Sequence, residues 1–233
     1  ICTASPFYYW TPNTGDNSLL IQNLTFHGVA STTNSIGIKT DGTTAGNSAV
    51  IDSCRFIGGI YFGIQAYASW PQTIKNCYFN GVGRPVIGDS NSLVYMHNCT
   101  ILNAPSSINL QNSGEIKNCV FINAGATQYF GAGVTASNNA STDTAPGTSG
   151  QSNLIFDELR FWATDLGGYG LIAPQIFPDS ALASGGTDVG LTTDIDGLAY
   201  NAGVYPIGCS RGHTILPNIG TVLDSETYNG LVP

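Results

Sequence analysis

Apolar residues recur along the chain in a short phrase, at relative positions −3, 0 and +2 around a central Cys or Leu. Five copies are clear and one is degraded, and they begin at Ile21, Ile51, Ile74, Met96, Ile116 and Phe156. The step from 0 to +2 is the alternation of a β-strand, whereas positions −3 and 0 would lie on opposite faces of a straight strand. The phrase therefore predicts two short strands joined by a sharp bend.

The residue in the bend, directly before the central Cys or Leu, is most often asparagine. Asn23, Asn76, Asn98 and Asn118 occupy this position in four of the six copies. Asparagine tolerates the left-handed backbone conformation that a one-residue corner requires. A third strand is predicted upstream of the phrases, for example at residues 36–38. Each repeat is therefore expected to contribute three strands and an Asn corner.

The copies follow one another at the spacing expected of a solenoid. Successive central positions lie 30, 23, 22, 20 and 40 residues apart, and such a period with occasional insertions indicates stacked repeats. Helical periodicity is absent. The sequence therefore predicts an all-β fold, a single-stranded right-handed parallel β-helix of about six coils with an irregular C-terminal cap.

The boundaries of this organisation follow from the repeat. Residues 1–17 are expected to be an entry segment or the edge of a trimmed larger chain, and residues 18–165 the β-helix. Residues 137–152 are rich in Ser, Thr, Gly and Ala and are predicted to be a loop insertion in the β-helix. Residues 166–233 are predicted to form the C-terminal cap or extension.

The inward apolar positions and the Asn corners resemble those of the pectate-lyase-like superfamily of right-handed β-helices over residues 18–165. The stretches 177–185, 194–197 and 205–208 are similar to the ending of bacterial and phage-encoded β-helix repeat proteins. The chain departs from that ending at residues 198–200, which read Leu-Ala-Tyr. The resemblance implies the fold and a terminal cap, and it implies little about chemistry.

Four cysteines, Cys54, Cys77, Cys99 and Cys119, share the central position of the phrase. Stacked coils place them in one inward column of parallel side chains. Parallel side chains do not converge on a metal ion and leave the sulfurs in poor geometry for disulfides. Buried, reduced thiols that fill the core are therefore expected.

The charge balance excludes some classes of function. The chain has 7 Lys and Arg against 15 Asp and Glu, a net charge of −8, and only 9% charged residues. It cannot present the basic stripe of a nucleic-acid binder, and no apolar run approaches the roughly 20 residues of a membrane span. Its polarity comes from Asn, Ser, Thr and Gly, which suits an extracellular or virion-surface location.

Polysaccharide cleavage would require carboxylates in suitable pairs. A hydrolase uses two of them, and a lyase that acts on uronates uses a Ca²⁺ cluster and a base. Asp41, Asp89 and Asp157 are weak catalytic candidates. No cofactor is expected, and Ca²⁺ is the alternative. Asp194 and Asp196 begin like a Ca²⁺ loop but lack its later ligands, and a turn held by Asx hydrogen bonds is the alternative.

An apolar stripe is predicted on the outside of the strand that follows the Asn corner. Ile57, Leu102, Ile122 and Trp162 share one outward position, with Val120 beside them. Exposed stripes of this size are unusual on monomers. Either the stripe is a subunit interface, in a homotrimer by resemblance to β-helix spikes, or the insertion or the C-terminal segment covers it.

Three functional interpretations stay open. The first is a non-catalytic structural or surface-recognition module of a virion, of phage spike or decoration type, or of an extracellular protein. Its partners would be copies of itself, other virion or surface proteins, or a glycan. Trp70, Tyr129 and Trp162, together with Tyr67 and Phe130, are candidates for stacking on a glycan. The second interpretation is a secreted polysaccharide lyase or glycoside hydrolase, and the third is a fragment of a bacterial cell-surface adhesin.

Overall fold

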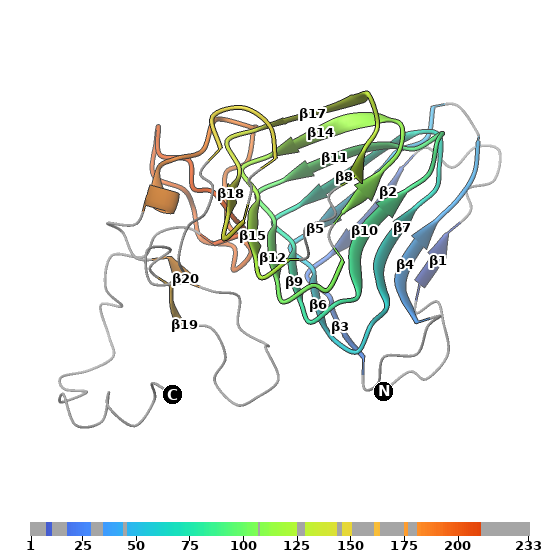
Figure 1. Ribbon diagram of the computed structural model, residues 1–233, viewed down its shortest axis with the longest axis horizontal. Coiled ribbons are helices and arrows are strands. Elements are labelled where there is room, and N and C mark those ends of the chain that lie inside the picture. Colours follow the sequence, from blue (N-terminus) through green and yellow to red (C-terminus); the bar gives the residue numbers. More distant parts are fainter. Residues whose placement is uncertain are drawn as a thin grey trace.

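The computed structural model describes residues 8–10, 18–28, 35–43, 46–106, 108–124, 129–143, 146–150, 161–163, 175–176 and 181–210. Within these ranges the chain forms three parallel six-stranded sheets, each built from every third strand. Three consecutive strands, one from each sheet, make one coil, and successive coils stack side by side (Figure 1). The predicted all-β parallel β-helix is confirmed.

The three sheets are named A, B and C in the order in which the chain enters them. Sheet A contains β1 (Tyr8–Trp10), β4 (Ile36–Thr40), β7 (Phe62–Ala66), β10 (Arg84–Gly88), β13 (Asn109–Leu110) and β16 (Tyr129–Phe130). Sheet B contains β2 (Leu19–Gln22), β5 (Ala49–Asp52), β8 (Pro71–Lys75), β11 (Leu93–His97), β14 (Ser113–Lys117) and β17 (Gly133–Ser137). Sheet C contains β3 (Thr25–Gly28), β6 (Arg55–Gly58), β9 (Tyr78–Asn80), β12 (Thr100–Leu102), β15 (Val120–Ile122) and β18 (Ala140–Ser141).

The predicted corner between sheets B and C has the backbone conformation that the asparagines indicated. The corner φ angles are 57° at Asn23, 51° at Ser53, 52° at Asn76, 49° at Asn98, 55° at Asn118 and 53° at Asn138. A second left-handed corner ends sheet C, at Gly58, Gly81, Asn103 and Asn123. This second row of corners was not predicted, although each of its residues lies four positions after a central cysteine.

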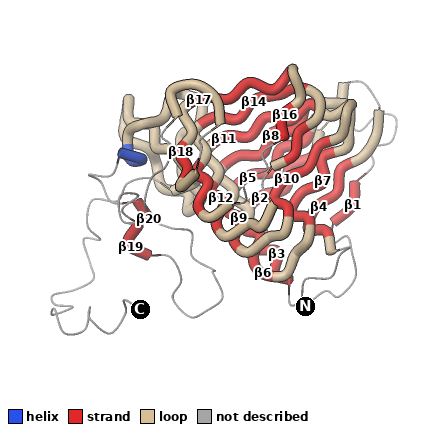
Figure 2. Tube along the Cα trace, viewed as in Figure 1, coloured by secondary structure: helices blue, strands red, loops and turns tan. Residues whose placement is uncertain are grey.

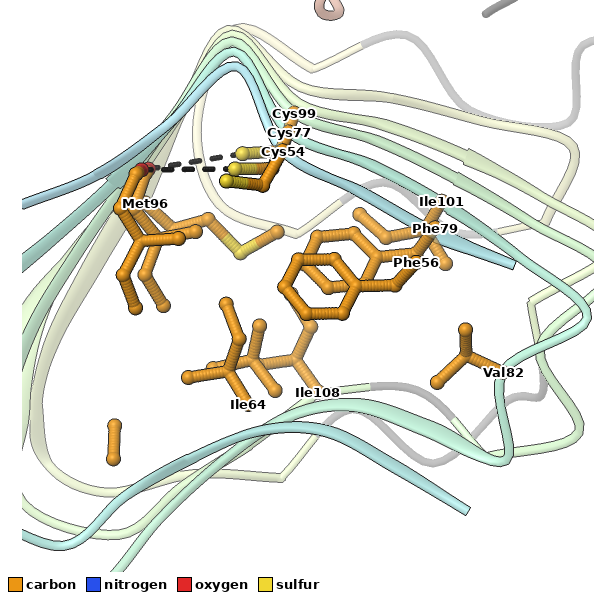
Figure 3. Packing of buried hydrophobic residues seen from close by; sticks show 14 of the residues in the cluster. Cys54, Phe56, Ile64, Cys77, Phe79, Val82, Met96, Cys99, Ile101 and Ile108 are labelled. Carbon is orange, nitrogen blue, oxygen red and sulfur yellow. Dashed lines mark hydrogen bonds between the residues drawn. The ribbon is translucent and has the colours of Figure 1, made fainter. Parts of the chain in front are cut away.

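The core consists of columns of identical or similar side chains. The rings of Phe26 and Phe56 stack at 4.9 Å, and those of Phe56 and Phe79 at 4.8 Å, nearly parallel in both cases. These distances match the spacing of neighbouring strands, so each ring lies on the ring of the previous coil. Figure 3 shows the phenylalanine column beside the column of cysteine thiols.

The cysteine column is buried and reduced, as predicted. Cys54, Cys77, Cys99 and Cys119 are free and fully buried. Each thiol lies near a backbone carbonyl of the preceding coil, for example Cys99 Sγ at 3.7 Å from the oxygen of Ile74 (Figure 3). The thiols therefore fill the core and add weak hydrogen bonds between coils.

Part of the predicted loop insertion at 137–152 belongs to the β-helix instead. Asn138 forms a corner and Asn139 takes the place of the central cysteine. The buried amide of Asn139 accepts a hydrogen bond from the N–H of Cys119 and donates to the carbonyls of Ile116 and Pro146. This copy of the phrase was not recognised in the sequence because the polar residue Asn139 stands at an inward position where an apolar residue is expected. The copy predicted at 156–161 lies outside the described residues except for Phe161.

Beyond the three sheets, β19 (Phe161–Ala163) and β20 (Gln175–Ile176) form a separate antiparallel pair. Residues 181–210, here named the strap, contain one short 3₁₀ turn, η1 (Ala181–Ala183), and lie along sheet C (Figures 1 and 2). The strap is largely without regular secondary structure, and the side chains of sheet C hold it in place. No helix in the described part of the chain is long and apolar enough to cross a membrane.

Candidate functional site

The outer face of sheet A brings two of the predicted carboxylates into one column. Thr40, Ala66 and Gly88 are partners in the register of β4, β7 and β10. Asp41, Tyr67 and Asp89 are the residues that follow them, and all three side chains are half-buried. Gly88 is paired with Leu110, so Gln111 continues the column in the next coil. With about 4.8 Å between strands, the backbones of Asp41 and Asp89 are roughly 10 Å apart, with Tyr67 between them.

The two carboxylates are held by local contacts. Oδ1 of Asp41 accepts a hydrogen bond of 2.9 Å from the N–H of Gly42, and Oδ1 of Asp89 accepts one of 3.0 Å from the N–H of Asn91. Nζ of Lys39 lies 3.5 Å from Oδ2 of Asp41. Each carboxylate therefore has a fixed orientation at the end of a strand and keeps oxygen lone pairs that could accept further hydrogen bonds.

The hydroxyl of Tyr67 lies in a mixed electrostatic environment. Burial raises its pKa above the ordinary value, as do the charges of Asp89 and Asp41, while Lys39 and Arg84 oppose the increase. The ammonium group of Lys39 also lies 5.9 Å from the centroid of the Tyr67 ring, within the range of a cation–π contact. Tyr67 is therefore a neutral hydrogen-bond donor between two carboxylates.

An aromatic and cationic group lies at the opposite end of the same strands. The guanidinium group of Arg84 is 5.8 Å from the ring centroids of both Tyr61 and Phe62. These two rings meet edge to face at 4.6 Å. No carboxylate of the described residues pairs with Arg84. Sheet A thus presents an apolar, cationic end and an acidic, hydroxyl-bearing end.

The outer face of sheet B is also charged, but its groups pair with one another. Lys75 lies 3.3 Å from Asp52, and Glu115 bridges His97 at 2.9 Å and Lys117 at 2.7 Å. Lys75, His97 and Lys117 follow one another in register, so the acidic groups relieve the repulsion within a basic column. Burial lowers the pKa of His97, although the hydrogen bond to Glu115 opposes this.

The remaining aromatic candidates for glycan binding are not available for that role or lie outside the description. Trp70 is 2% exposed and packs against Ala49 and Ala68, so it cannot stack on a glycan and this prediction was wrong. The side chains of Tyr129 in β16 and Trp162 in β19 lie outside what the structure describes, as does Asp157. Tyr67 is the aromatic candidate that reaches the column.

The predicted apolar stripe is real, but the strap covers it. Leu102, Val120 and Ile122 form a buried cluster with Leu182, Ile195, Ile207 and Cys209 of the strap. Ile57 is 3% exposed. The interpretation of these residues as a subunit interface is therefore wrong, because their burial is complete within one chain. The alternative that the C-terminal segment covers the stripe is the one that the structure supports.

The corner asparagines hold the strap through its backbone. Nδ2 of Asn76, Asn98 and Asn118 donates to the carbonyls of Thr193, Pro206 and Thr187 at 3.0, 3.0 and 2.7 Å, respectively. Asn118 Nδ2 also donates to Oδ1 of Asn98. Asn23 lies in the first coil and is exposed. The ladder thus has a second role, as a row of donors for an extended segment.

The aspartates that resemble a Ca²⁺ loop make other contacts. Oδ1 of buried Asp194 accepts hydrogen bonds from the N–H groups of Asp196 and Leu198 at 3.0 and 2.9 Å, which is an Asx turn. Oδ1 of Asp196 lies 2.6 Å from the guanidinium group of Arg55. Within the described ranges, no group of three or more His, Cys, Asp or Glu side chains could hold a metal ion.

Comparison with known proteins agrees with the fold. A family model described as a right-handed β-helix region matches residues 13–169, which is well over half of the chain. No curated protein and no solved structure matches. The match includes the strands that carry the acidic column of sheet A and ends before the strap.

Proposed function

The chain belongs to the right-handed β-helix family, and from that premise we propose that it is a surface-recognition module that binds glycans on the outer face of sheet A. The observation that carries the proposal is the polar column of Asp41, Tyr67, Asp89 and Gln111. The carboxylates of Asp41 and Asp89 accept hydrogen bonds from sugar hydroxyls, the amide of Gln111 both accepts and donates, and Tyr67 adds a neutral donor. Neighbouring coils repeat these groups at the scale of a sugar chain.

The charges favour a neutral glycan over a polyuronate. The column carries two carboxylates, and its nearest cation, Lys39, is already paired with Asp41. Carboxylates of a polyuronate laid along the column would meet like charge, and like-charge contacts discriminate against a partner. Arg84 and the rings of Tyr61 and Phe62 add an apolar platform at the other end of the strands.

A location on a virion or in the extracellular space goes with this proposal. A recognition face on a rigid shaft supports it, as does a polarity that comes from Asn, Ser, Thr and Gly. Assembly as a homotrimer stays a prediction, now without the apolar stripe as its basis. The mass of the native particle, measured by light scattering after size exclusion, tests it: a trimer supports assembly and a monomer refutes it.

Binding is tested by affinity electrophoresis of the full chain in gels containing galactomannan, dextran or polygalacturonate. We expect a neutral polysaccharide to retard the protein and Tyr67→Ala to weaken retardation by about tenfold, the size typical of an aromatic anchor. Tyr95→Ala is the matched control, because Tyr95 is equally half-buried but belongs to β11 of sheet B. Absence of retardation in all gels, or equal losses for both variants, would refute the proposal.

A polysaccharide hydrolase is the second candidate, and the shared column of Asp41 and Asp89 favours it. Inverting hydrolases place their carboxyl groups about 6.5–9.5 Å apart, and the separation of roughly 10 Å between the two aspartate backbones is close to that range. A reducing-end assay on the polysaccharides that bind decides this. If the parent protein forms new reducing ends and both Asp41→Asn and Asp89→Asn do not, catalysis is supported. If the polymer stays intact, the hydrolase candidate is refuted and only the proposal of recognition stands.

A further inference from the structure

The strap touches five successive coils, although it is a single short segment. Asp196 pairs with Arg55 in the second coil at 2.6 Å, and Gly185 accepts a hydrogen bond from Asn138 in the sixth coil at 3.4 Å. The coils between them bond to it through Asn76, Asn98 and Asn118. No strand pair in the three sheets spans more than adjacent coils.

The strap runs past sheet C three times, at residues 182–187, 193–196 and 205–209, and these three passes are also bonded to one another. The N–H of Ile195 donates to the carbonyl of Cys209 at 2.9 Å, and the N–H of Ile207 donates to the carbonyl of Leu182 at 2.7 Å. A third bond of 2.9 Å joins the N–H of Gly186 to the carbonyl of Tyr205. Movement of one pass away from its coil would therefore also break its hydrogen bonds to the neighbouring passes, which are themselves bonded to other coils.

The strap lies close against the sheet at its last pass. Gly208 has a φ of 101°, and a Cβ on it would lie 2.9 Å from Oγ1 of Thr100 and 3.0 Å from a methyl group of Val120. The N–H of Cys209 donates to the same Thr100 hydroxyl at 3.0 Å. Only glycine allows this approach, so the docking of the strap depends on steric fit and not only on non-specific hydrophobic contact.

We infer that the strap is a clamp that couples the second to the sixth coil into one cooperative unit. In a solenoid each repeat contacts only its neighbours, so stability is a sum of local terms and end coils can open alone. A segment bonded to five coils removes that independence, because opening an end coil also costs the strap contacts of the others. The clamp is therefore a stability device, separate from glycan binding on sheet A.

The buried cysteines provide one probe for each of four clamped coils. Cys54, Cys77, Cys99 and Cys119 belong to the second, third, fourth and fifth coils, and Cys209 belongs to the strap. Burial raises the pKa of Cys99, and it raises that of Cys209 to about 12. Thiols of this kind react with an alkylating reagent only after the structure around them opens.

The test is alkylation of the full native chain with iodoacetamide, with each cysteine quantified by peptide mass spectrometry. In the parent protein we expect the four core thiols to react at one common rate. In Gly208→Ala we expect Cys209 to react first, and the core thiols to separate by about tenfold or more, with an end coil fastest. Gly203→Ala is the matched control, because Gly203 also has a left-handed φ of 75° but open space around it.

Two outcomes would overturn the inference. One is a gradient of rates among the four core thiols already in the parent protein, since the coils would then open independently. The other is a variant in which Cys209 reacts faster while the core thiols keep a common, unchanged rate, since the strap would then be only a lid. If Gly208→Ala does not fold, Asp196→Asn, which weakens the ion pair with Arg55, is measured in the same way with the same criteria.

Discussion

Asn118 combines the two roles of the corner residues, and its substitution tests both. Its φ is 55° and its side chain is fully buried. Nδ2 donates to Oδ1 of Asn98 at 3.1 Å and to the carbonyl of Thr187 at 2.7 Å, and Oδ1 accepts from the N–H of Thr187 at 2.9 Å. Asn118→Ala removes all three bonds. It also places in the left-handed region an alanine, whose side chain cannot form the local hydrogen bonds by which asparagine tolerates this conformation.

The expected loss of stability follows from these contacts. A left-handed conformation costs an alanine about 1–2 kcal/mol, and the lost hydrogen bonds cost about 1 kcal/mol each, more where a partner stays buried. Asn118→Ala is therefore expected to lower the free energy of unfolding by about 4 kcal/mol. Asn118→Gly loses the same bonds but avoids the strain, against an entropic cost of about 0.5–1 kcal/mol, so it should be about 1 kcal/mol milder.

Urea unfolding, followed by far-ultraviolet circular dichroism and tryptophan fluorescence, measures both variants at constant m value. Asn201→Ala is the control, since Asn201 is exposed and lies outside the left-handed positions, and it should change stability by no more than about 0.5 kcal/mol. A loss below about 1 kcal/mol in Asn118→Ala would refute the role of the contacts. Equal losses for the alanine and glycine variants would refute the strain at the corner.

Two further substitutions probe the other faces of the β-helix. Ile122→Glu buries a charge under the strap and should cost more than about 3 kcal/mol in the same urea assay, against about 1 kcal/mol for Ile122→Val; unchanged stability with a changed assembly mass would restore the interface interpretation. Burial lowers the pKa of His97 from its ordinary value of 6.5, next to Glu115, Lys117 and Lys75. The unfolded chain then binds the proton more tightly, so stability should fall as the pH drops below about 6.5, and His97→Gln should flatten that part of the profile. Burial raises the pKa of Glu115, but hydrogen bonds from Lys117 and His97 outweigh this effect and lower the pKa below its ordinary value of 4.5. A second loss of stability below about pH 4.5 should therefore remain in His97→Gln. An unchanged slope between pH 5 and 7 in His97→Gln would contradict the assignment to this residue.

The fold could be predicted because its causes are local and repeated. A corner needs one residue that accepts a positive φ, and Asn23, Asn76 and Asn98 announce it in the sequence. The inward residues are repeated at the spacing of the coils, so the cysteine and phenylalanine columns follow from the phrase alone. The copy at Asn138 escaped because its inward residue, Asn139, satisfies its amide through hydrogen bonds instead of being apolar.

The acidic column could not be predicted because it depends on register across loops of unequal length. Cys54 lies 13 residues after Asp41, whereas Cys77 lies 10 residues after Tyr67 and Cys99 lies 10 residues after Asp89. Counting from the repeat therefore places Asp41 out of step with the other two. Only the pairing of β4 with β7 brings them together. The extra residues are absorbed between sheets A and B, where a longer loop does not disturb the strands.

The position of the strap has the same kind of cause. Its apolar residues Leu182, Ile195 and Ile207 are far apart in the sequence and show no period, because the segment is irregular and folds against a surface that others build. The outward stripe was visible, but the sequence contains no signal for its occupant. The hydrogen bonds from side-chain amides to strap carbonyls could not be predicted from the sequence either, since any residue supplies a backbone carbonyl.

The three outer faces of the β-helix therefore differ in what they leave for a ligand. On sheet C the strap takes up the apolar stripe and the corner amides. On sheet B the described acidic and basic groups neutralise each other in contacts of 2.7–3.3 Å. On sheet A, Oδ1 of Asp89 accepts a hydrogen bond from the backbone N–H of Asn91. Arg84 lies on aromatic rings, without a carboxylate partner among the described residues. Polar groups at a half-buried surface that do not satisfy one another retain their capacity for a partner. Recognition is therefore expected on sheet A, and the clamp on the adjoining sheet C would keep successive coils, and with them the spacing of the column, fixed.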